Sequence, residues 1–177
     1  EIALQFSEPV SAGDDAVRLF DPSGELVSGI SGTTRDDTLA ATVPDREALI
    51  FGDRRFTFGD LAERSRRLAS YLHAQGLGCH TERSELEPHE SGQDHLALYL
   101  YNGNEYLEAH YGAFKMRGVP INVNYRYIDE ELVYLLDNAD AEALVFHSSL
   151  GDRVERIRGR LPKLKLLIEV DDGAPGQ

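Results

Sequence analysis

Cysteine is almost absent from this sequence, because Cys79 is the only one among 177 residues. A single cysteine cannot form an internal disulfide bond, and this is typical of proteins from a reducing compartment. We therefore expect a cytoplasmic protein. No motif places a histidine or another base where it would activate the Cys79 thiol, so we do not expect a catalytic cysteine.

Basic residues are also scarce: 18 lysines and arginines stand against 31 aspartates and glutamates, which gives a net charge of −13. Nucleic acids and anionic membrane surfaces would repel such a chain, so neither is an expected partner. The sequence lacks any apolar run near the roughly 18 residues that a transmembrane helix requires. Apolar residues make up 41% of the chain and charged residues 28%, as in ordinary globular domains.

Residues 1–35 have a pattern of their own. Three short alternating runs, 2–6, 16–20 and 25–27, are separated by clusters of serine, proline, glycine and aspartate. The runs predict three small antiparallel strands, and the clusters predict the turns between them. Residues 29–34 read as a linker. We therefore predict a β-rich segment with a linker at 1–35 and a separate domain at 36–177.

The second part begins with a predicted hairpin and a long helix. Gly52 and Asp53 separate two apolar runs, 48–51 and 55–58, which is a hairpin signal. The helix predicted over 60–72 carries Leu61, Leu68 and Leu72 on one face, and Gly76 is a natural terminator beyond its end.

From residue 96 onward, predicted strands and helices alternate. Strands are predicted at 96–101, 119–123, 143–146 and 164–170, with helices at 104–116, 129–136 and 152–161 between them. Such alternation indicates parallel strands joined by right-handed crossovers. The expected fold class is α/β, a partial layered parallel sheet with flanking helices. Residues 77–94 interrupt the pattern as a long acidic surface loop.

Open α/β sheets bind ligands beyond the carboxyl ends of their strands. Five polar residues occupy such positions and are our candidates for contact with a substrate: Asn102, Asn104, Asn122, Asn124 and Arg126. Capping and turn hydrogen bonds are the alternative explanation for these residues.

Histidines and tyrosines suggest two further sites, neither of which we expect. His80, His89 and His95 lie in or beside the acidic loop, but no tight ligand spacing indicates a metal site. Seven tyrosines lack interleaved basic residues, so we expect core packing rather than stacking on nucleic-acid bases. These are Tyr99, Tyr101, Tyr106, Tyr111, Tyr125, Tyr127 and Tyr134.

About 130 residues resemble the opening portion of the adenylate-forming enzymes, which include acyl-CoA synthetases. The resemblance lies in the order and spacing of three segments, Pro44–Leu61, Leu98–Ala109 and Gly112–Tyr127. It is strongest to fatty-acid and steroid-side-chain CoA ligases of actinobacterial type. The resemblance implies an AMP-forming ligase that activates a fatty or other hydrophobic carboxylic acid as an acyl-adenylate and transfers it to CoA.

The same resemblance implies ATP, CoA and Mg²⁺ as cofactors of the full-length enzyme, and none held by this chain alone. The family's phosphate loop, acidic metal ligands and catalytic lysine would lie beyond Gln177, so we expect no catalytic residue here and no activity of the chain by itself. Ser31–Thr34 matches core letters of that loop, but Asp36 and Asp37 follow it and would repel phosphate. A homo-oligomer or a separate carboxyl-terminal portion is the expected protein partner.

Two alternatives remain open. A truncated sheet leaves strand edges that favour a binding or regulatory module without catalytic activity. Residues 1–30 resemble part of a copper-resistance β-sandwich of CopC type, which would suggest a metal-associated β protein. The copper-binding histidines of such domains are not present in this stretch, so no metal ligand follows from that resemblance.

Overall fold

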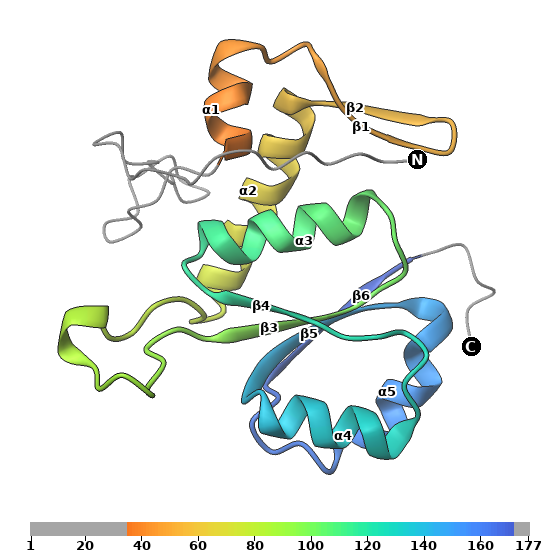
Figure 1. The fold of residues 1–177 in the computed structure, drawn as a ribbon. Helices are drawn as coiled ribbons and strands as arrows, with labels where there is room; N and C mark the ends of the chain where they lie inside the picture. Colours follow the sequence, from red (N-terminus) through yellow and green to blue (C-terminus); the bar gives the residue numbers. More distant parts are fainter. Residues whose placement is uncertain (1–34, 172–177) are drawn as a thin grey trace.

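The computed structural model describes residues 35–171 (Figure 1). The predictions for residues 1–34, namely the three strands, the linker and the Ser31–Thr34 segment, lie outside this range. The described part begins with helix α1 (Arg35–Thr42), followed by strands β1 (Glu47–Phe51) and β2 (Arg54–Thr57) and the long helix α2 (Phe58–Ala74).

The hairpin and the long helix form as predicted. Strands β1 and β2 pair antiparallel, and Gly52 adopts a φ of +59° in the turn between them. Thr57 then caps α2, because its hydroxyl accepts a hydrogen bond from the Asp60 N–H while the Asp60 carboxylate accepts one from the Thr57 N–H. Beyond the helix, Gly76 has a φ of +86°, a conformation that glycine adopts without strain.

The sheet has four strands in the order β4-β3-β5-β6, and every pair is parallel. Its strands are β3 (His95–Tyr99), β4 (Val119–Asn122), β5 (Ala141–His147) and β6 (Leu166–Val170). The crossover helices are α3 (Asn104–Lys115), α4 (Asp129–Asn138) and α5 (Gly151–Arg158), with short 3-10 turns at Arg83–Glu85 and Ser148–Leu150. Figure 1 shows α2 and α3 on one face of the sheet and α4 and α5 on the other. The predicted α/β class and parallel pairing are confirmed.

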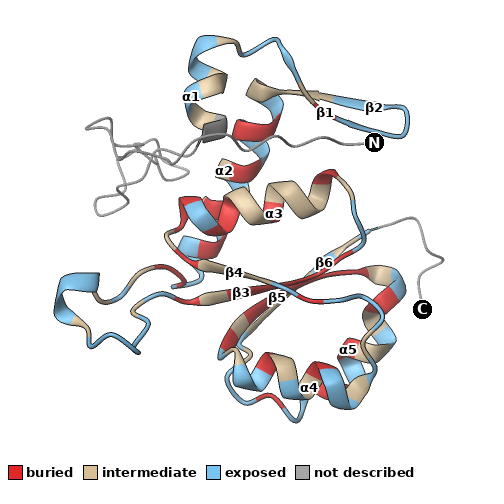
Figure 2. Ribbon diagram, in the orientation of Figure 1, coloured by how far each residue is buried: buried red, intermediate tan, exposed pale blue. Residues whose placement is uncertain are grey.

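Each face of the sheet has its own apolar cluster. Alternate residues of β3 divide between them: Leu96 and Leu98 pack toward α2 and α3, whereas Ala97 and Tyr99 pack toward α4 and α5. Figure 2 shows the buried residues concentrated on the strands and on the helix faces that cover them. This two-sided burial explains why β3 and β5 read as continuous apolar runs in the sequence.

A buried ion pair joins α1 to the rest of the layer. The Lys115 side chain is fully buried, and its Nζ donates to Asp37 Oδ1 at 2.9 Å and to Ser65 Oγ at 2.8 Å. The amphipathic patterns of these helices do not predict that pair, because lysine is expected on the solvent side.

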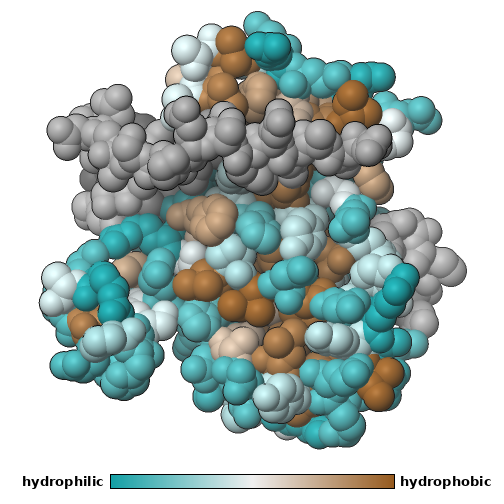
Figure 3. All heavy atoms as spheres, viewed as in Figure 1, coloured by the Kyte–Doolittle hydropathy of each residue, from teal (hydrophilic) through white to brown (hydrophobic). Residues whose placement is uncertain are grey.

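The acidic loop between α2 and β3 projects from the sheet and is mainly hydrophilic (Figures 1 and 3). Its base is fixed by Asp94, whose carboxylate accepts hydrogen bonds from the Gly78 N–H at 2.8 Å and from His80 Nε2 at 2.6 Å. None of the helices formed by residues 35–171 combines the length and apolar character of a membrane-spanning segment.

The expectation that the tyrosines pack in the core is wrong for three of the seven. Tyr99 is fully buried, but Tyr101, Tyr125 and Tyr134 are 37%, 38% and 72% exposed. Tyr101 and Tyr125 follow strand ends and project beyond the sheet, and Tyr134 lies on the outer surface of α4. Helical and strand periodicity located these residues correctly, but it did not say which of them the neighbouring layers cover.

Candidate functional site

All four parallel strands end at one edge of the sheet, which we call the carboxyl edge. Tyr101 and Asn102 follow β3, Asn124 follows β4, His147 ends β5, and Asp171 follows β6. Polar side chains from separate strands therefore gather where ligands bind in open α/β sheets.

A cavity of about 480 Å³ opens at this edge. Strand ends form one side of it, and the tip of the β1–β2 hairpin and the start of α3 form the other. Its lining residues are Phe51, Arg54, Tyr101, Asn102, Glu105, His147 and Asp171.

Tyr101 and His147 form the aromatic wall of the cavity. The Tyr101 backbone N–H donates to His147 Nδ1 at 3.0 Å, and the two rings stack with centroids 5.3 Å apart. Because Nδ1 accepts this bond, the proton of the neutral imidazole lies on Nε2. The hydrogen bond and the stacking together hold the His147 ring in a fixed orientation.

Arg54 and Glu105 form an ion pair across the mouth of the cavity. Arg54 Nη1 lies 3.0 Å from Glu105 Oε1, and the same guanidinium lies 5.3 Å from the centre of the Phe51 ring. Partial burial opposes ionisation of Glu105, but its hydrogen bonds to backbone and to Arg54 outweigh that effect and lower its pKa.

The cavity therefore has no excess of positive charge. Arg54 is offset by Glu105, and Asp171 adds a second carboxylate. A triphosphate requires the opposite balance, with several backbone N–H groups or cations directed at its oxygens. The lining residues suit a neutral or weakly polar group better than a polyphosphate.

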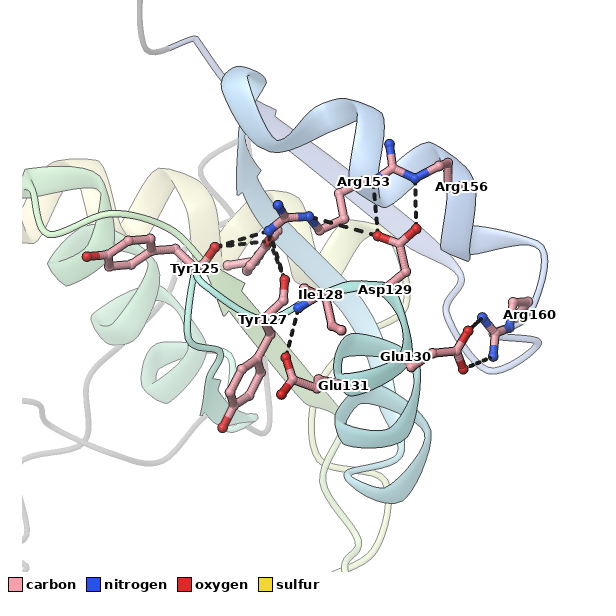
Figure 4. Close-up of polar contacts among 10 residues, drawn as sticks. Tyr125, Tyr127, Ile128, Asp129, Glu130, Glu131, Arg153, Arg156 and Arg160 are labelled. Atoms are coloured by element: carbon pink, nitrogen blue, oxygen red, sulfur yellow. Dashed lines mark hydrogen bonds and ion pairs between the residues drawn. The ribbon is translucent and has the colours of Figure 1, made fainter.

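The loop from Val123 to Ile128 carries the other part of the edge. Asn124 Oδ1 accepts a hydrogen bond from the Arg126 N–H at 3.0 Å, and the Arg126 guanidinium lies 5.4 Å from the centre of the Tyr125 ring. The Tyr125 ring in turn packs against Tyr101, with centroids 5.0 Å apart. Figure 4 shows this loop held from α5 by Arg153.

The structure exposes four of the five predicted site residues around the carboxyl edge but does not give them one role. Asn102 is exposed and lines the cavity. Asn122, Asn124 and Arg126 are exposed around the end of β4 and do not line it. The alternative explanation by turn bonding applies to Asn124, whose side chain closes a turn.

Asn104 lies inside the protein instead. It is fully buried as the first residue of α3, and its Nδ2 donates to Glu108 Oε1 at 2.7 Å. Its Oδ1 is buried without a hydrogen-bond partner among the described residues. This position in the sequence indicated a strand end, but the side chain bonds along α3 to Glu108, which in turn pairs with Arg64 of α2.

Sequence reasoning missed most of the cavity: Phe51, Arg54, Tyr101, Glu105, His147 and Asp171 were not candidates. The strand-end rule could have included His147 and Asp171, since each ends or follows a predicted strand. Phe51, Arg54 and Glu105 carried no such signal, because the hairpin reaches the sheet only through tertiary packing.

A second cavity, of about 540 Å³, lies at the opposite edge, where the strands begin. His80, Asp94, His95, Asp140, Glu142 and Lys163 are among its lining residues. Burial and the Asp94 carboxylate raise the pKa of Glu142. Within residues 35–171, no three histidine, cysteine, aspartate or glutamate side chains are arranged to hold a metal ion.

Comparison with known proteins identifies the domain. The family of AMP-binding enzymes matches residues 37–177. The medium-chain acyl-CoA ligase Mig of Mycobacterium avium is 55% identical over 134 residues, which cover 76% of this chain and 24% of that protein. The 3-oxocholest-4-en-26-oate–CoA ligase of Rhodococcus rhodochrous is 38% identical over 131 residues, covering 74% of this chain and 21% of that protein.

A solved structure shows the same fold. The fatty acyl CoA synthetase of Mycobacterium tuberculosis superposes with a TM-score of 0.65 at 21% identity, covering 78% of this chain and 26% of that one. The chain thus spans about a quarter of the length of the proteins that it matches.

Proposed function

Because the chain belongs to the family of AMP-binding enzymes, we propose that it forms the amino-terminal scaffold of an AMP-forming ligase that joins a hydrophobic carboxylic acid to CoA. The observation that supports this most is the 55% identity to a medium-chain acyl-CoA ligase over 134 residues. The carboxyl-edge cavity is consistent with it, since its walls combine aromatic rings with a few polar groups.

In this proposal the carboxyl edge is one wall of the active site. Asn102 contributes an amide to the cavity, and Asn122, Asn124 and Arg126 present exposed polar groups beside it. An amide donates and accepts without adding charge, so Asn102 would orient the carboxylic acid or the pantetheine arm of CoA. Asn104 is removed from this set, because it is buried against Glu108.

We propose that ATP and Mg²⁺ bind outside the carboxyl-edge cavity. The cavity lacks surplus positive charge, and residues 35–171 offer no arrangement of three metal-ligating side chains. We therefore assign the triphosphate, Mg²⁺ and the catalytic lysine to other parts of the complete protein, and expect the chain alone to be inactive. The proposal also includes a domain boundary near residue 36, a cytoplasmic location, and assembly with a carboxyl-terminal portion or a second copy.

The test is a graft. Residues of this chain replace the matched quarter of the Mycobacterium avium ligase, and acid-dependent AMP release is measured with ATP, CoA, Mg²⁺ and carboxylic acids of increasing chain length. We expect the graft to be active on hydrophobic acids and the isolated chain to release no AMP. AMP release by the chain alone would contradict the scaffold assignment, and a folded but inactive graft would contradict the family assignment of function.

Two asparagine variants of the graft test whether the carboxyl edge is a wall of the active site. Asn102→Ala removes the amide at the cavity, whereas Asn138→Ala removes an exposed asparagine at the far end of α4. Loss of one orienting hydrogen bond should lower kcat/KM about five- to tenfold for Asn102→Ala. Asn138→Ala should leave kcat/KM unchanged, and equal effects of the two variants would exclude a role for Asn102.

A further inference from the structure

Arg153 on α5 points toward the loop that carries Tyr125 and Tyr127 (Figure 4). Its Nη1 donates to the Tyr99 hydroxyl at 2.7 Å, to the Tyr127 carbonyl at 2.8 Å and to the Tyr125 carbonyl at 3.3 Å. The Arg153 side chain is only 30% exposed. One guanidinium group thus joins α5, the carboxyl end of β3 and the loop that follows β4.

This arrangement differs from the surface ion pairs on the same helix. Arg156 pairs with both oxygens of Asp129, at 2.7 and 3.0 Å, and the closest approach of Arg153 to that carboxylate is 3.9 Å. Arg153 therefore directs its short bonds to backbone carbonyls and a phenol. A cation that bonds to carbonyls fixes the direction of the peptide planes, which an ion pair between side chains does not do.

The two carbonyls belong to the loop that presents two candidate site residues. Between them lies Arg126, and immediately before them lies Asn124, whose Oδ1 accepts the Arg126 N–H at 3.0 Å. The Tyr127 N–H closes the same turn on the Asn124 carbonyl at 3.0 Å. Local turn bonds alone rarely hold an exposed segment in one conformation, and here the partly buried Arg153 guanidinium supplies an additional constraint.

We propose that Arg153 is a positioning residue that fixes the Asn124–Tyr127 turn and thereby holds Asn124 and Arg126 at the carboxyl edge. Which ligand Asn124 and Arg126 would contact depends on the proposed function, whereas the conformation of the turn does not depend on it. Arg153 itself does not line the cavity described above. It acts through the loop carbonyls and through Tyr99.

Hydrogen exchange on the chain as it exists tests the proposal without any ligand. Arg153→Gln removes the cation, Arg153→Lys retains charge and donors, and Arg158→Gln removes an exposed arginine that pairs with Glu155 on the same helix. We expect the Arg126 and Tyr127 amides to exchange about tenfold faster or more in Arg153→Gln. Arg153→Lys should restore part of the protection, and Arg158→Gln should have no effect.

Tyr99 provides an independent spectroscopic signal. Burial raises the pKa of Tyr99, and the bond from Arg153 opposes that rise. In Arg153→Gln the pKa of Tyr99, followed by NMR of ¹³C-labelled tyrosine, should therefore rise further. A merely structural role would reduce global stability and speed exchange across the whole sheet, without a change confined to this loop.

Unchanged exchange at the loop amides of Arg153→Gln would overturn the proposal, as would equal acceleration in β3 and β5. An inactive graft would contradict the proposed function while leaving the exchange result valid. Conversely, an active Arg153→Gln graft with unchanged KM would show that the turn does not need to be fixed, whatever the enzyme's substrate.

Discussion

The buried ion pair between Lys115 and Asp37 makes a sharp stability prediction. Lys115 is fully buried and the Asp37 side chain is 11% exposed, so the ammonium group is removed from water and lies 2.9 Å from the Asp37 carboxylate. Ser65 Oγ, at 2.8 Å, and the Ala62 carbonyl, at 3.4 Å, also accept hydrogen bonds from Lys115 Nζ. Asp37→Asn would keep an acceptor in place and remove the carboxylate charge that lies 2.9 Å from the ammonium group.

Leaving a buried charge without its counter-ion costs about 3–5 kcal/mol. The remaining hydrogen bonds and the new amide oxygen offset part of that, so we expect Asp37→Asn to lower the free energy of unfolding by about 3 kcal/mol. Lys115→Met removes the desolvated charge and keeps nearly the same volume, which should cost about 1 kcal/mol. Asp37 then still has Arg66 at 3.6 Å. The variant with both Asp37→Asn and Lys115→Met should lose about as much free energy of unfolding as Lys115→Met alone, and less than the sum of the two single losses.

Urea unfolding followed by far-UV circular dichroism measures these differences, because the chain has no tryptophan. With a urea dependence of roughly 1.5–2 kcal/mol per molar, the midpoint of Asp37→Asn should fall by about 1.5–2 M. Arg158→Met, which removes one partner of an exposed pair, is the control and should change stability by less than about 0.5 kcal/mol. If Lys115→Met proves as damaging as Asp37→Asn, the reasoning from an uncompensated charge is wrong.

Two further predictions concern packing and pH. An added Cβ at Gly118 would lie 2.9 Å from the Asp94 carbonyl oxygen, which is already fixed by its bond to the Val119 N–H, so Gly118→Ala should lower stability by about 1–3 kcal/mol in urea unfolding. Gly159→Ala, with nothing within 4 Å, should be neutral, and equal effects would refute the steric argument. The pKa of Glu105 is lowered in the folded state, so its stabilising effect is complete above the unfolded pKa and is lost as pH falls through the folded one. Glu105→Gln should therefore be less stable than the native chain by up to about 1 kcal/mol at pH 7, and the difference should disappear as pH falls through the lowered pKa of Glu105. A difference in stability that stays constant from neutral to acidic pH would contradict the role assigned to the carboxylate.

Much of the fold was predictable from periodicity and turn chemistry. The Gly52 turn, the Gly76 terminator and the apolar runs of β3 and β5 place the hairpin, the long helix and the parallel strands, because each signal has a local physical cause. Pairings between distant helices were not predictable in this way. The Lys115–Asp37 pair depends on how α1 packs against α2 and α3, and no local pattern assigns a lysine to the interior.

The candidate site was predictable only as far as the course of the backbone determines which residues lie at strand ends. Strand ends indicated the edge of the sheet where the cavity lies and one residue that lines it, Asn102, but they could not distinguish Asn104, which lies two residues later and is buried. Side-chain direction at the first turn of a helix depends on its neighbours, here Arg64 and Glu108. The contribution of Arg153 was invisible for the same reason, since the sequence shows an arginine on a charged amphipathic helix and the fold turns it toward the loop carbonyls. A residue that shapes the carboxyl edge, Arg153, is therefore recognised by its hydrogen bonds to backbone carbonyls. The polar residues at the strand ends indicate only where that edge lies.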